Sequence, residues 1–159
     1  MFSQTVEYAL RAMACLALDP ETRSASAALA ERTQVPADYL AKVLQQLAGA
    51  GLIEGRRGVG GGYRLAAKPE DINLLDVINA VEPVKRITSC PLNLPNHGPN
   101  LCPLHRRMDE AITGVIKVFD NNSLKDLLLS EDGQLGSVPL CDQNQTVQVS
   151  INLTGPASS

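Results

Sequence analysis

The fold is decided by the stretch RRGVGGGYRL at residues 56–65. Its four glycines allow the positive φ angles of a tight hairpin, and a backbone without side chains can approach phosphate groups closely. Residues 52–54 and 63–65 have strand patterns and are predicted to form the two arms. A helix is predicted directly before them, over residues 36–48. A basic, glycine-rich hairpin after a short amphipathic helix is the arrangement of a winged helix-turn-helix, so we expect double-stranded DNA as the partner.

Apolar residues at helical spacing predict two further helices before this unit. The first covers residues 3–18, and the second ends near Arg32 with Ser24 or Ser26 as its capping residue. In the third predicted helix Pro36 suits the first position, where its missing N–H costs nothing. The apolar residues that follow fall at i, i+3, i+4 and i+7, so they form one buried stripe.

The pattern after the hairpin predicts a short helix over residues 74–81 and an irregular segment over residues 84–104. One long helix follows, and its apolar seam over residues 108–119 needs a partner. Ser123 can cap a final short helix over residues 124–129.

The composition shows that DNA binding must come from local charge. The 159 residues carry a net charge of −3, so the protein as a whole is not basic. No apolar run approaches the length of about 18 residues that a membrane span needs. The N-terminus lacks the pattern of a secretory signal, so we expect a cytoplasmic protein whose four cysteines are reduced thiols or metal ligands.

The third helix and the hairpin supply the candidate DNA contacts. A helix fits the major groove, and the arginines of the wing add salt-dependent affinity. Asp38 has two interpretations, because it can accept a hydrogen bond from a cytosine or satisfy the positive helix N-terminus. A nucleotide phosphate is the weaker alternative ligand, since the glycines precede a strand and no P-loop motif is present. The candidate DNA-binding residues are Asp38, Tyr39, Lys42, Gln45, Arg56, Arg57, Gly60, Gly61, Tyr63 and Arg64.

Several motifs occur together in this chain. They are YALRA at 8–12, VPADYL at 35–40, LQQL at 44–47, GLI at 51–53, RGVGGGYRL at 57–65 and LDVINAVE at 75–82. In this combination the sequence resembles the IscR/NsrR family of bacterial transcription regulators. The resemblance implies a dimer whose long C-terminal helices cross between subunits, in agreement with the unpaired seam. It also implies that Tyr39 and Arg57 contact DNA and that the wing enters the minor groove.

The predicted fold is therefore mainly α with a small β-hairpin wing, a winged helix-turn-helix followed by a long C-terminal dimerisation helix. The predicted divisions are a DNA-binding domain over residues 1–82, a sensor loop over 83–104, the dimerisation helix and short final helix over 105–130, and a polar tail over 131–159. Alternating apolar residues in the tail make 146–153 a candidate strand.

A sensor is predicted where Cys90, His97, Cys102 and His105 gather within 16 positions. Cluster-binding members of the family carry three cysteines before the long helix. Cys90 and Cys102 match the outer two, whereas Asn96 stands at the middle position. A [2Fe–2S] cluster takes four ligands, and histidine can replace cysteine among them.

The resemblance thus implies a mixed [2Fe–2S] site of Cys90, Cys102 and His105, with Glu7 from the partner subunit as a fourth ligand. Glu7 and His105 can each also be explained without a metal. Glu7 can form an i,i+4 ion pair with Arg11, and His105 can be a solvated residue in the first turn of the long helix.

A thiol switch is the main alternative to a cluster. Cys90 and Cys102 are separated by 11 residues, which permits a disulfide, and a position near a helix N-terminus would raise the reactivity of Cys102. A regulator without any cofactor is the third interpretation. Cys15 is predicted to be a small core residue, and the sequence identifies no partner for Cys141.

The expected function is that of a sequence-specific regulator and not of an enzyme, because no catalytic set stands out beyond this loop. The alternative is a winged helix module that joins proteins. In the regulator, occupation or oxidation of the 90–105 loop would shift the arrangement of the reading helix and the wing.

Overall fold

The structure is a computed structural model, and it describes residues 2–91 and 100–129. Its elements are α1 (Gln4–Ala17), α2 (Ser26–Thr33), α3 (Ala37–Gly49), β1 (Ile53–Arg56), β2 (Gly62–Leu65), the 3-10 helix η1 (Pro69–Asp71), α4 (Leu74–Val81) and α5 (Pro103–Asp120). This order confirms the mainly α class with one hairpin. Among these helices, none is long and apolar enough to span a membrane. The tail with its candidate strand, Cys141 and His97 lie outside the described residues.

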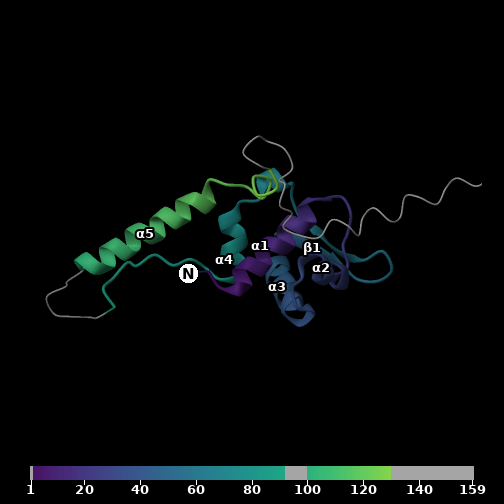
Figure 1. Ribbon diagram of the computed structural model, residues 1–159, viewed down its shortest axis with the longest axis horizontal. Coiled ribbons are helices and arrows are strands. Elements are labelled where there is room, and N and C mark those ends of the chain that lie inside the picture. Colours follow the sequence, from purple (N-terminus) through teal and green to yellow (C-terminus); the bar gives the residue numbers. More distant parts are fainter. Residues whose placement is uncertain (1, 92–99, 130–159) are drawn as a thin grey trace, which may run out of the picture.

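Helix α1 lies at the centre of the core. It packs against α2, α3, α4 and β2, and Figure 1 shows these elements as one body from which α5 extends. The side chains of Ala9, Ala12 and Met13 are completely buried in this packing. Cys15 is 1% exposed, which confirms its predicted place in the core. The small side chains let the neighbouring helices approach α1 closely.

The wing is a two-stranded antiparallel hairpin in which Ile53 pairs with Leu65 and Arg56 with Gly62. A third segment is joined to it, because Ser24 and Tyr63 exchange two backbone hydrogen bonds of 2.8 Å each. The predicted serine cap of α2 is therefore wrong. The N-cap is Ala25, and its side chain makes no capping hydrogen bond.

Several boundaries of the other helices and strands differ from the prediction by one or two residues. Pro36 is the N-cap of α3 and not its first residue. The long helix begins at Pro103, with Cys102 as its N-cap, and not at residue 105. Since proline favours the first turn of a helix, its position at the start of α5 has a simple local cause.

The predicted final helix over residues 124–129 is wrong, because this segment forms turns. Its backbone amides donate to another part of the chain. Leu124 N donates to the Ile72 carbonyl at 2.8 Å, and Lys125 N donates to the Pro69 carbonyl at 3.2 Å. Leu124 is completely buried. Tertiary hydrogen bonds and burial thus replace the helical pattern that the apolar spacing suggested.

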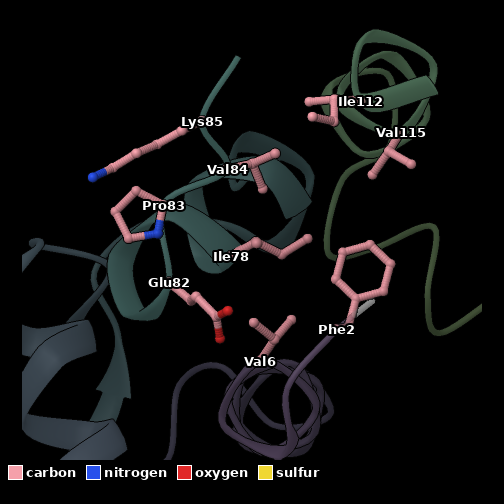
Figure 2. A pocket seen from close by; sticks show the side chains of 9 residues that line it. All are labelled: Phe2, Val6, Ile78, Glu82, Pro83, Val84, Lys85, Ile112 and Val115. Carbon is pink, nitrogen blue, oxygen red and sulfur yellow. The ribbon is translucent and has the colours of Figure 1, made fainter. Parts of the chain in front are cut away.

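Helix α5 meets the rest of the fold across an apolar cavity of about 180 Å³. Figure 2 shows Ile112 and Val115 of α5 on one side of this cavity, with Val6 and Ile78 among the residues opposite. Part of the predicted dimerisation seam therefore faces its own subunit. Leu104, Met108 and Val118 are instead 63%, 47% and 60% exposed.

We predict that Gly62→Ala destabilises the wing. Gly62 has φ = 125°, and an added Cβ would lie 2.6 Å from the Ser24 carbonyl oxygen. The free energy of unfolding should fall by about 1–3 kcal/mol, the usual cost of a strained backbone. Urea denaturation measures this change. Gly49→Ala is the matched control, because a Cβ there meets nothing within 4 Å and the φ angle is not positive. A loss no larger than that of the control would contradict the prediction.

Candidate DNA interface and metal centre

Helix α3 presents one polar face to solvent. Its apolar stripe is buried against the core, which leaves Asp38, Tyr39, Lys42 and Gln45 exposed, as expected for a reading helix. Tyr39 is 55% exposed, and its ring meets that of Tyr8 edge to face at 6.2 Å. The Lys42 ammonium lies 5.8 Å from the centre of the Tyr39 ring. These contacts hold an aromatic side chain and a cation together on the outer face.

The wing places bare backbone and two arginines side by side. Arg56 and Arg57 are exposed, and neither forms an ion pair within the described part of the chain. Gly60 has φ = 71°, which favours glycine. A Cβ on Gly61 would lie 2.4 Å from the Arg56 carbonyl oxygen, so the turn has no room for a side chain.

The arginine on the second strand has a different environment. Arg64 Nε lies 2.7 Å from Glu54 Oε1, across the hairpin. Arg23 also approaches Glu54, with its Nη2 3.8 Å from the second carboxylate oxygen and its Nη1 donating to the backbone carbonyl at 3.1 Å. Sequence reasoning missed Glu54, although its register opposite Arg64 follows from the hairpin. Much of the charge of Arg64 is therefore neutralised inside the wing.

Three of the predicted sensor residues come together at the start of α5. Cys102 Sγ lies 3.1 Å from His105 Nδ1, and Cys90 Sγ lies 3.6 Å from the same nitrogen. The three ligand atoms all lie within 4.8 Å of one another. His105 is only 9% exposed, so its interpretation as a solvated residue is wrong. None of the three cysteines in the described ranges forms a disulfide.

The donors reach this cluster from two segments. Cys102 and His105 share the first turn of α5, so helical geometry sets their separation. Cys90 belongs to the segment over residues 83–91, which leaves the end of α4 and runs beside α5 (Figure 1). The position of this segment therefore decides whether the third donor is in place.

An ion pair that the sequence did not reveal joins this segment to α5. Asp109 accepts hydrogen bonds from Arg86 Nε at 2.6 Å, from Arg86 Nη2 at 2.5 Å and from the Ile87 amide at 3.0 Å. The hydrogen bond from Arg86 and that from Ile87 lower the pKa of Asp109, although desolvation opposes them. The carboxylate therefore stays ionised at neutral pH. We call the contact of Arg86 and Ile87 with Asp109 the Asp109 clamp.

Glu7 lies outside the group of three donors within one chain. Its Oε1 is 2.6 Å from Arg11 Nη2, which is the expected i,i+4 ion pair. Arg11 Nη1 also donates to the Thr33 carbonyl at 3.4 Å, at the C-terminal end of α2. The fourth ligand that the sequence implied for the cluster thus has an alternative partner in its own subunit.

An exposed reading helix, a glycine-rich wing and a separate thiol site place this protein in the class of winged helix regulators. Comparisons with known proteins specify the class further. Residues 2–130 match the Rrf2 family, described as iron-dependent transcriptional regulators, and the chain belongs to this family. It is a family of regulators and not of enzymes.

The relatives are similar over most of their length. The chain is 35% identical to the regulator NsrR of Halalkalibacterium halodurans over 133 residues, which is 79% of this chain and 88% of the relative. The structure of T. potens IscR matches 80% of this chain and 85% of its own, with a TM-score of 0.67 and 26% identity. The structure of CymR, the global cysteine regulator of B. subtilis, matches 80% and 95% of the two chains, with a TM-score of 0.66 and 26% identity.

Proposed function

We propose that the protein is a sequence-specific regulator that binds double-stranded DNA through α3 and the wing. The observation that carries this proposal is the pair of exposed arginines at the wing, which form no ion pair in the described ranges. In this interpretation the exposed side chains of α3 face base edges and phosphates in the major groove. The remaining candidate contacts are Tyr63 and the peptide groups of Gly60 and Gly61. In this proposal they contact the sugars and phosphates of the DNA.

We predict that Arg57→Ala weakens DNA binding and makes it less sensitive to salt. Removing one phosphate contact should reduce the slope of log K against log salt concentration by about 0.9. Fluorescence anisotropy with a labelled operator fragment at several salt concentrations measures the slope. Arg64→Ala should change it less, because Glu54 already neutralises Arg64. Arg107→Ala, on α5, is the control for loss of one positive charge. A slope for Arg57→Ala equal to that of the control would remove Arg57 from the interface.

We also propose that the active form is a homodimer held by α5. From the apolar seam predicted over residues 108–119, a charge at Ile112 or Ile116 is expected to break such a dimer. The apolar side chains of Leu104, Met108 and Val118 are exposed on this helix, and they offer a surface that a second copy can cover. Because Ile112 also lines the intrachain cavity, a charge there would disturb the subunit itself.

Met108→Asp should convert the dimer to a monomer, because it places a charge in an apolar interface. Light scattering coupled to size-exclusion chromatography measures the mass. Arg107→Asp is the matched control, since it introduces the same side chain at an exposed polar position next to Met108. A monomeric mass for the unmodified protein would refute the dimer. An unchanged dimer in Met108→Asp would place the interface on another face.

The metal centre is proposed to hold an iron–sulfur cluster that controls DNA affinity. The donor set fits this group in its chemistry, because thiolates are the usual ligands of iron–sulfur clusters and histidine occurs beside them. Cys90, Cys102 and His105 supply three donors, and Glu7 of the partner subunit is the candidate for a fourth. The cluster would supply a redox-active and reactive group. Cys90 as a ligand would then tie the segment over residues 83–91 to α5 at a second point, beside the Asp109 clamp, and so favour one arrangement of the dimer.

Protein purified without oxygen should show visible absorption bands, with iron and sulfide near two of each per chain, as expected for a [2Fe–2S] cluster. Cys90→Ser and Cys102→Ser should each lose most of the iron. Cys15→Ala is the matched control, because Cys15 is buried in the core. If the unmodified protein and the three variants contained equal amounts of iron, the ligand assignment would be refuted.

A thiol switch is the second candidate function, and the short separation of the two sulfur atoms favours it. The Cys90 and Cys102 Sγ atoms lie within 4.8 Å of each other. Oxidation by hydrogen peroxide would join the two thiols in a disulfide and release two molecules of water. A protein that stays colourless after anaerobic reconstitution but loses two thiols to peroxide would support the switch and not the cluster.

A further inference from the structure

A contact between segments that are distant in sequence lies three residues before Cys90 along the chain. Cys102 and His105 are fixed relative to each other by the first turn of α5. Cys90 approaches them along the segment over residues 83–91, and Asp109 accepts three hydrogen bonds from Arg86 and Ile87 of that segment. We propose that Asp109 is a positioning residue for the metal centre, which holds Cys90 within reach of the two donors on α5. This inference rests on the proposed metal-binding function of the site.

The chain length between the clamp and the thiol supports this role. Asp109 follows His105 by one turn, a rise of about 6 Å along the helix. Cys90 is the third residue after Ile87, and three residues span at most about 11 Å. A chain held at Ile87 therefore keeps Cys90 near His105. Toward α4, the next hydrogen bond within the described part of the chain is that of the Val84 amide to Asn79, and Cys90 is the sixth residue after Val84. Loss of the clamp would therefore double the length of chain between this anchor and the thiol.

The charges of the clamp indicate that Asp109 does not ligate the metal itself. Arg86 engages both carboxylate oxygens, and the side chain of Asp109 is only 12% exposed. The compact group of donors consists of Cys90, Cys102 and His105 and does not include Asp109. Arg86 thus compensates a buried carboxylate that would otherwise compete with the thiolates for a cation. A positioning role and a ligand role predict opposite effects of removing Arg86.

The test uses Co²⁺ as the probe, added without oxygen to the reduced 159-residue protein. Thiolate-to-cobalt charge-transfer absorption reports the affinity and the number of sulfur ligands. Arg86→Gln and Asp109→Asn should each weaken Co²⁺ binding about threefold to tenfold. The threefold loss is the entropic cost of doubling the length of a flexible loop. The tenfold loss is the low end of the range for residues that orient metal ligands, which is about tenfold to a hundredfold. The charge-swapped double variant with Arg86→Asp and Asp109→Arg should recover only part of the affinity, because a guanidinium cannot accept the hydrogen bond from the Ile87 amide.

The matched control is Arg107→Gln, which removes the exposed Arg107–Glu110 pair of 2.8 Å on the same helix without touching the clamp. Circular dichroism and the melting temperature establish that each variant folds. Affinities equal to the control would overturn the positioning role, as would tighter binding in Arg86→Gln, which would make Asp109 a ligand.

The experiment distinguishes a wrong positioning role for Asp109 from a wrong assignment of the metal site. If the unmodified protein binds neither Co²⁺ nor iron, the proposed metal function and the inference fall together. If the unmodified protein binds Co²⁺ and both clamp variants bind it equally well, only the positioning role is refuted. DNA binding by the wing is measured on the same variants, and it should keep its salt dependence, because the clamp lies outside α3 and the hairpin.

Discussion

Close packing around α1 is the constraint on which both the candidate DNA interface and the candidate metal centre depend. Ala9 and Ala12 are completely buried between α1 and its neighbours, and their small side chains allow short distances between helices. A larger side chain would separate the helices at a cost of about 1–3 kcal/mol. Through α3 the packing fixes the exposed reading face. Through α4 it fixes the point from which the segment over residues 83–91 departs toward the metal centre.

Features with a local cause could be predicted from the sequence. The apolar period of α3 and the glycines of the hairpin each act within one segment, and the three donors of the metal centre stood out because few residue types bind soft metals. The turns after Ser123 were predicted wrongly, because the Leu124 amide donates to the distant Ile72. The Asp109 clamp and the burial of His105 were not predictable, since they depend on how separate segments meet and no spacing pattern records that.

The charge of the wing shows how an acidic protein can present a basic surface. The net charge is −3, so long-range attraction to DNA is weak. Within the hairpin, Glu54 compensates Arg64 and approaches Arg23 near the base of the strands. Arg56 and Arg57 remain exposed close to the glycine turn, so the uncompensated charge is concentrated at the tip. Such an arrangement keeps the arms of the wing folded while the tip retains its affinity for phosphate.

The ion pair of Glu7 with Arg11 links the proposed metal centre to the DNA-reading helix. A carboxylate that ligates a metal shares its negative charge between the metal and any guanidinium that it still contacts, here Arg11 at 2.6 Å. If Glu7 completes the site of a partner subunit, as proposed, the attraction between its carboxylate and Arg11 weakens. Arg11 also donates to the Thr33 carbonyl, where α2 ends shortly before the reading helix begins. Ligation would therefore change the charge balance at the turn that sets the direction of α3, which is the kind of differential contact that a shift between two arrangements requires.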